Sequence, residues 1–148
     1  MATPLLPADF KEFLKLLNSK EVEYLVIGGY AVGYYGYVRA TADMDIWIAP
    51  TRVNAAKAVS VIRDFGFDTP ELSVELLLTP GNVIRMGVPP FRIELLTTPS
   101  GVQFDECYRE RVVDKLGDVP VPFISLKHLK INKQAAGRRK DLLDLDNL

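Results

Sequence analysis

Two aspartates separated by one residue, Asp43 and Asp45, open an apolar stretch that ends at Ile48. Side chains alternate along a β-strand, so both carboxylates point to one face while Met44 points to the other. Their Cα atoms would lie roughly 6.6 Å apart. Carboxylates this close repel each other unless a cation lies between them, and hard oxygen ligands suit Mg²⁺ or Mn²⁺. The pair therefore predicts a divalent-metal site at the head of a strand.

The sequence just upstream has the features of an anion-binding segment. An apolar stretch ending at Ile27 runs into Gly28 and Gly29. Because glycine lacks a Cβ, the backbone can turn sharply there and a bulky anion can approach its N–H groups. A helix predicted from about Tyr30 would add its N-terminus to such a site. An ordinary tight turn is the alternative for the glycine pair taken alone, but the acids that follow favour phosphate binding.

The stretch from Ile27 to Ile48 resembles the signature of the DNA polymerase β-like nucleotidyltransferase superfamily. That signature is a hydrophobic residue, Gly-Gly or Gly-Ser, a spacer, and then two acids separated by a hydrophobic residue. The spacer here runs from Tyr30 to Ala42, which is 13 residues and at the long end of the pattern. The segment Arg39 to Asp45 is most similar to the minimal prokaryotic branch. That branch contains antibiotic nucleotidyltransferases and the toxin enzymes of abortive-infection, type IV-like systems.

The resemblance implies that a third catalytic, metal-binding acid comes from a later strand and is flanked by hydrophobic residues. Glu94 has this position in the stretch Phe91 to Leu96. A charge among such apolar neighbours is costly to bury unless it is paired. The family more often has Asp there, and a structural ion pair between Arg92 and Glu94 is the alternative interpretation. The rival candidates for the third acid are Glu75, Glu71 and Asp105.

A basic run lies near the C-terminus and contains Lys127, Lys130, Lys133, Arg138, Arg139 and Lys140. It is either a solvated helix face or a patch for triphosphate or RNA phosphates. The segment from Lys133 to Asp144 resembles a second motif of the toxin-like enzymes, Lys-x-Ala-x-Gly-Arg-x-Lys-Asp. This match implies a role for Lys133, Arg138, Lys140 and Asp141, in phosphate binding or in fixing the last helix.

Six residues are the nucleotide-binding candidates: Gly28, Gly29, Arg39, Thr41, Lys133 and Arg138. For Arg39, a surface cation and a group that steadies carboxylates and phosphate are equally good interpretations. Thr41 is better explained as a local hydrogen-bond partner of the backbone than as a reactant.

Periodicity and turn residues predict the secondary structure. Helices are expected over 8–20, from the cap Thr51 to Gly66, within 71–79, over 126–136 and over 139–148. Strands are expected over 21–27, 42–48, 82–86, 91–97, 112–116 and 119–123, while 104–113 is left unassigned. Helices and strands alternate without strict βαβ units, which predicts an α/β (α+β) fold with a mixed sheet and flanking helices. The resemblance implies more narrowly a nucleotidyltransferase, polymerase β palm-like fold.

Length and composition limit the classes of protein to which this chain can belong. The 148 residues, of which 48% are hydrophobic, suit a single domain over 1–148 with a real core. The net charge of −1 argues against binding a polyanion by bulk charge alone. One cysteine, Cys107, excludes an internal disulfide and fits a cytoplasmic location. No apolar run approaches the ~18 residues of a membrane helix, so no membrane partner is expected.

Together with the resemblance, these features predict a metal-dependent enzyme that moves a nucleoside monophosphate from a nucleoside triphosphate, such as ATP, to an acceptor hydroxyl. The expected acceptor is RNA or tRNA, as in the toxin-like branch, and an antitoxin is a possible partner. One alternative is transfer to a small molecule, as in the antibiotic-modifying enzymes. Another is a nucleotide-binding or antitoxin-like module without turnover.

Overall fold

A six-stranded mixed β-sheet forms the centre of the protein, in the order β3-β4-β2-β1-β6-β5. The computed structural model describes residues 6–41 and 43–148. The strands are β1 (Tyr24–Ile27), β2 (Asp43–Ile48), β3 (Val83–Met86), β4 (Arg92–Leu96), β5 (Val112–Leu116) and β6 (Val119–Phe123). β2 runs parallel to β4 and β1 parallel to β6, while the other neighbours are antiparallel. The predicted α+β class with a mixed sheet is confirmed.

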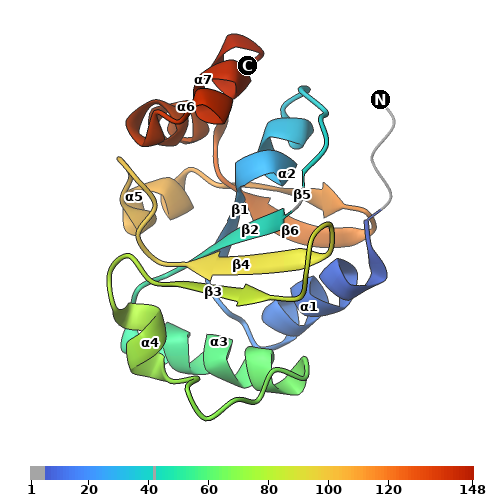
Figure 1. The fold of residues 1–148 in the computed structure, drawn as a ribbon, viewed down its shortest axis with the longest axis vertical. Coiled ribbons are helices and arrows are strands. Elements are labelled where there is room, and N and C mark those ends of the chain that lie inside the picture. The colour runs from blue at the N-terminus through green and yellow to red at the C-terminus, as the bar shows by residue number, and fades with distance from the viewer. Residues whose placement is uncertain (1–5, 42) are drawn as a thin grey trace.

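Helices cover both sides of this sheet (Figure 1). They are α1 (Ala8–Ser19), α2 (Gly28–Tyr34), α3 (Arg52–Asp64), α4 (Val74–Leu78), α5 (Phe104–Arg109), α6 (Leu126–Ala136) and α7 (Arg139–Asp146). Figure 1 shows α3 and α4 on one side of the sheet and α2, α6 and α7 on the other. Within the described part of the chain, no helix combines the length and the apolar composition needed to cross a membrane.

Strand alternation separates a core face from a polar face on β2 and β4. Met44 and Ile46 are fully buried in the hydrophobic core, and so is Leu95 on β4. Asp43 and Asp45 alternate with the buried residues of β2 and keep partial access to solvent, as predicted. The polar side chains of both strands therefore face the side on which α2, α6 and α7 lie.

Helix ends follow local sequence signals. The Thr51 hydroxyl caps α3 by accepting a hydrogen bond from the Asn54 N–H at 3.2 Å, and Ser125 caps α6 by accepting one from the His128 N–H at 3.2 Å. Gly137 closes α6 in the left-handed conformation, with φ +63°. These predictions are confirmed because capping depends on residues that are neighbours in sequence.

Several predicted boundaries are wrong. β1 begins at Tyr24 rather than Glu21, because Glu21 takes a left-handed turn, with φ 55°, as the chain leaves α1. α2 begins at Gly28 rather than Tyr30, so the glycine pair forms the first turn of the helix instead of a loop before it. Residues 104–113 hold α5 and the start of β5, and the predicted strand residue Ala42 lies outside the described residues.

α3 and α7 bury different kinds of side chain. On α3 the buried apolar residues include Ala55, Ala58, Val59 and Ile62, while Val53 is 71% exposed and Ala56 is exposed. On α7, the apolar residues Leu142 and Leu143 are exposed, whereas Asp141 and Asp144 are buried.

Candidate functional site

Three carboxylates converge on the polar face of β2 and β4. The parallel pairing of these strands sets Asp45 opposite Glu94 and Asp43 opposite Arg92. One carboxylate oxygen from each of Asp43, Asp45 and Glu94 lies within 4.8 Å of the others. Of the four candidates for the third acid, the structure thus brings Glu94 to the aspartates. Its rival Glu75 instead pairs with Arg52 at the surface.

Two arginines from the sheet contact this carboxylate cluster. Arg92 binds Asp43 with two hydrogen bonds, Nε to Oδ1 at 2.7 Å and Nη2 to Oδ2 at 3.1 Å. The same Arg92 Nη2 lies 3.4 Å from Glu94 Oε1, and Arg85 Nε lies 3.1 Å from that oxygen. The ion pair between Arg92 and Glu94, which the sequence offered as an alternative to a metal site, therefore exists within the cluster itself.

Asp45 is the member of the cluster that lacks such a partner, since no lysine or arginine of the described chain forms an ion pair with it. Burial, followed by repulsion from Glu94, a hydrogen bond with Glu94 and repulsion from Asp43, raises the pKa of Asp45 to about 7. The positive charge of Lys140 acts in the opposite direction. A partly buried carboxylate in this situation gains stability from a bound cation, because the cation removes the repulsion that disfavours its ionised form. The donor set, three carboxylates, fits a hard divalent ion.

The glycine pair lies directly against the aspartate and the loop beside it. A Cβ on Gly28 would overlap the Asp45 carboxylate, and its φ of +66° also favours glycine. A Cβ on Gly29 would lie only 2.6 Å from Thr41 Oγ1. The Thr41 hydroxyl itself donates to the Asp43 carbonyl oxygen at 3.0 Å, which is the local role predicted for it. Packing against Asp45 and Thr41 therefore favours glycine at both positions, independently of the predicted contact with an anion.

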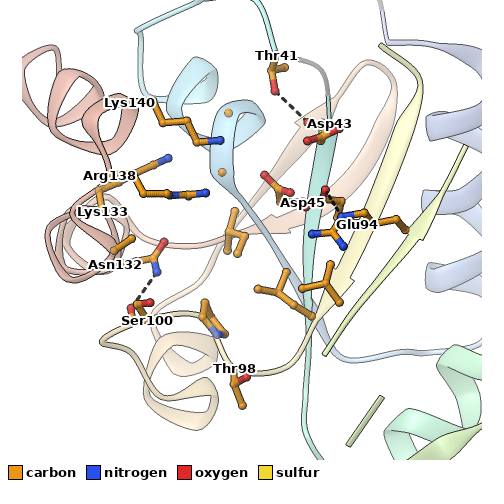
Figure 2. A pocket seen from close by; sticks show the side chains of 18 of the residues that line it. Thr41, Asp43, Asp45, Glu94, Thr98, Ser100, Asn132, Lys133, Arg138 and Lys140 are labelled. Atoms are coloured by element: carbon orange, nitrogen blue, oxygen red, sulfur yellow. Dashed lines mark hydrogen bonds and ion pairs between the residues drawn. The ribbon is translucent and has the colours of Figure 1, made fainter. Parts of the chain in front are cut away.

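A pocket of about 510 Å³ extends from these residues toward α6 and α7. Figure 2 shows Asp43, Asp45 and Glu94 on its sheet side, and Lys133, Arg138 and Lys140 on its helical side. The predicted site residues that line it are Gly28, Gly29, Arg39, Thr41, Asp43, Asp45, Glu94, Lys133 and Arg138. The volume lies within the usual range for pockets that bind small molecules.

Three cations that line the pocket, Arg39, Lys133 and Arg138, already form ion pairs with carboxylates of α7. Lys133 is buried, and its Nζ lies 3.2 Å from Asp141 Oδ1 and 3.0 Å from Asp144 Oδ2. Arg39 binds the two oxygens of Asp144 through Nε and Nη2, at 2.7 and 2.8 Å. Arg138 holds Asp141, with Nε 2.7 Å from Oδ2, although 62% of its side chain is exposed. A solvated helix face is therefore the wrong description of Lys133, and Arg39 is neither a free surface cation nor an ion-pair partner of Asp43, Asp45 or Glu94.

The pocket lining also includes polar residues that were not among the site candidates from the sequence: Arg85, Thr98, Ser100, Asn132 and Lys140. Lys140 belongs to the C-terminal motif, which was the available signal for it. Arg85 reaches Glu94 because β3 pairs with β4 and sets the two residues opposite each other. No local pattern marks Ser100 or Asn132, since only the packing of the segment after β4 against α6 brings them to the pocket.

Neither protein-family models nor curated protein sequences give a match to this chain.

Proposed function

We propose that this protein is a metal-dependent nucleotidyltransferase, which moves a nucleoside monophosphate from a nucleoside triphosphate to an acceptor hydroxyl. The observation that carries the proposal is the convergence of Asp43, Asp45 and Glu94 within 4.8 Å, across a pocket from Arg138 and Lys140. Carboxylates facing cations suit a substrate that brings both divalent metal and phosphate. The narrower assignment of a polymerase β palm-like fold is part of this proposal.

Asp43, Asp45 and Glu94 would hold Mg²⁺ or Mn²⁺, which when bound offsets the charge of the triphosphate and lowers the pKa of the acceptor hydroxyl. In the reaction, the acceptor oxygen forms a bond to the α-phosphorus while the bond to pyrophosphate breaks. The chain itself contributes positioning, since β2 and β4 fix the carboxylates in register. Gly28 and Gly29 leave backbone N–H groups free of side chains where the phosphates approach.

Lys140 is the cation best placed to bind the triphosphate. It is exposed, lines the pocket and forms no ion pair with any described residue, while its charge acts on Asp45. Arg138 can assist, because its guanidinium has donors beyond those that Asp141 engages. Lys133 and Arg39 line the same pocket, but they act first by holding the buried carboxylates of α7.

RNA, and tRNA in particular, is the acceptor that we propose, with the protein acting as a toxin-like enzyme whose antitoxin would be its partner. The support is the resemblance of the segment from Lys133 to Asp144 to the second motif of the toxin-like enzymes. A small-molecule acceptor and a nucleotide-binding module without turnover are the alternatives that the following experiment separates.

The test is incubation with each α-labelled nucleoside triphosphate and Mg²⁺, with total RNA in one arm and a panel of hydroxyl-bearing antibiotics in the other. We expect label in an RNA band, release of pyrophosphate and loss of both with EDTA. Asp43→Asn, prepared in parallel, controls for a contaminating transferase. Label in the antibiotic arm alone would indicate that the acceptor is a small molecule. If neither arm is labelled but the nucleotide raises the melting temperature, the protein is better described as a nucleotide-binding module without turnover.

A further inference from the structure

The pocket has two chemically different ends. One end contains the carboxylate cluster and, at the start of α7, the cations Arg138 and Lys140. The other end is lined by uncharged residues, among them Leu96, Thr98, Pro99, Ser100 and Asn132. Figure 2 shows Thr98, Ser100 and Asn132 grouped at this neutral end, away from Lys140. A ligand that fills the whole pocket would therefore be strongly anionic at one end and neutral at the other.

Contacts on two sides fix the neutral end. The Asn132 side chain on α6 donates from Nδ2 to the Ser100 carbonyl oxygen at 2.9 Å. Gly101 packs so closely on α6 that a Cβ at this position would overlap the Ala135 Cβ. The Thr98 hydroxyl accepts a hydrogen bond from the Gly81 N–H at 2.9 Å. The segment that follows β4 is thus attached both to α6 and to the turn before β3, and it forms a preorganised wall.

Asn132 has hydrogen-bonding capacity to spare at this wall. A side-chain amide offers two N–H donors and a carbonyl oxygen with two lone pairs. Among the described residues its one hydrogen bond is the one to Ser100, and its side chain is only partly buried. An adjacent donor and acceptor remain, and this pair matches the edge of a nucleobase, as in the bidentate recognition of adenine by asparagine.

We propose that the neutral end of the pocket is a nucleoside subsite and that Asn132 selects the base. The inference rests on the proposed nucleotidyl transfer for its ligand class, and it adds the orientation of the substrate. The base lies against the wall that the segment 98–101 and α6 form together, and the triphosphate extends past the carboxylates toward Lys140. Asn132 is thus a specificity-determining residue, because a site that hydrogen-bonds one base leaves polar groups unpaired when another base occupies it.

The test compares the affinities of ATP, GTP, CTP, UTP and inorganic tripolyphosphate, each with Mg²⁺, measured by calorimetry. For the wild-type protein we expect one nucleotide to bind more tightly than the weakest by about five- to a hundredfold, the discrimination of one bidentate pair. Asn132→Ala should reduce this spread to about twofold or less while leaving the affinity for tripolyphosphate unchanged. Asn132→Gln keeps the amide but displaces it, so it should also change the order of the four nucleotide affinities. Because this variant retains a polar side chain of the same type, it serves as a second test in case Asn132→Ala misfolds.

Asn147→Ala is the matched control, because the Asn147 amide also donates to a backbone carbonyl oxygen at 2.9 Å, that of Leu143, away from the pocket. It should alter none of the five affinities. The proposal is overturned if all four nucleotides bind the wild type no better than tripolyphosphate, or if both Asn132 variants keep the wild-type ranking. These binding results do not depend on turnover. A base preference that Asn132 controls would therefore support the subsite even in a protein that transfers no label, and labelled RNA with an unchanged ranking would support the transferase alone.

Discussion

Two clusters of charged residues border the same pocket, and they are balanced differently. In the carboxylate cluster of Asp43, Asp45 and Glu94, two arginines reach Asp43 and Glu94, and none forms an ion pair with Asp45. In the helix cluster of Arg39, Lys133, Arg138, Asp141 and Asp144, each carboxylate has two cationic partners. Lys133 binds both aspartates, Arg138 binds Asp141, and Arg39 binds Asp144.

The pKa values of the aspartates show the effect of this difference. Burial and neighbouring acids raise the pKa of Asp45 to about 7. Burial by itself would also raise the pKa of Asp141, but hydrogen bonds from Arg138 and Lys133 outweigh it and hold that pKa below its ordinary value. Asp144 behaves in the same way through Arg39 and Lys133. The buried carboxylates of Asp141 and Asp144 have counter-charges and stabilise the fold, whereas the partly buried carboxylate of Asp45 lacks them among the described residues and could bind a cation from solution.

The largest expected effect is the loss of nucleotidyl transfer in Asp45→Asn. We expect the rate to fall by at least about a hundredfold, the scale for removing one group that stabilises the transition state directly. The fold should persist, and removal of one negative charge should raise the melting temperature in metal-free buffer. Labelled transfer and thermal unfolding measure the two effects. Asp105→Asn, at an exposed rival acid, should change neither, and full activity in Asp45→Asn would refute the metal-site assignment.

Lys133→Met should show the opposite pattern, with the main loss in stability. It leaves Asp141 and Asp144 buried with one fewer cation each, and breaking a buried ion pair from one side costs about 3–5 kcal/mol. Denaturant unfolding measures this loss. Lys127→Met is the control, because the exposed pair of Lys127 with Glu110 should contribute less than about 1 kcal/mol. If Lys133→Met instead kept its stability and lost triphosphate affinity, Lys133 would be the phosphate ligand that the sequence suggested.

The two clusters should also respond to pH with opposite signs. The folded-state pKa of Asp45, about 7, exceeds its ordinary value of 3.8, so between these pH values the folded protein binds a proton that the unfolded chain does not. In metal-free buffer its contribution therefore disfavours folding increasingly as pH rises through this window, by on the order of a few kcal/mol. The stability advantage of Asp45→Asn over wild type should grow from pH 4 to pH 7.

For Asp144 the folded-state pKa is depressed, so its contribution is present above the ordinary carboxyl range and is lost as pH falls. The destabilisation caused by Asp144→Asn should accordingly shrink on acidification below about pH 4. Unfolding free energies of both variants and wild type across pH 3 to 8 provide the measurement. Parallel trends in the two variants would contradict the difference drawn between the clusters.

The smallest expected effect concerns basic residues outside the helix cluster. Lys130 and Arg139 take part in no ion pair within the described chain, so they remain free for an extended RNA. Each alanine variant should weaken RNA binding and reduce the salt dependence of log K by roughly one unit, as one phosphate contact is lost. Triphosphate affinity should hardly change. Binding curves at two salt concentrations test this, and unchanged slopes would remove the basic run as support for an RNA acceptor.

Features that depend on neighbours along the chain could be predicted from the sequence. Alternation along a strand placed Asp43 and Asp45 on one face, and the capping residues Thr51 and Ser125 set the starts of α3 and α6. The sequence also reduced the third acid to a few candidates. These features could be predicted because backbone geometry repeats over two to four residues, so that faces and ends are visible in local patterns.

Contacts between residues that are distant in sequence depend on the tertiary structure and could not be predicted from local patterns. The parallel register of β2 and β4 places Glu94, rather than Glu75, opposite Asp45. The packing of α6 and α7 puts Lys133 between two buried aspartates and directs Arg39 to Asp144, although the motif itself left phosphate binding and structural support equally open. Local periodicity cannot distinguish phosphate binding from structural support. A charged side chain is buried only where a partner from another part of the chain pairs with it, and the sheet register and the helix packing determine that pairing.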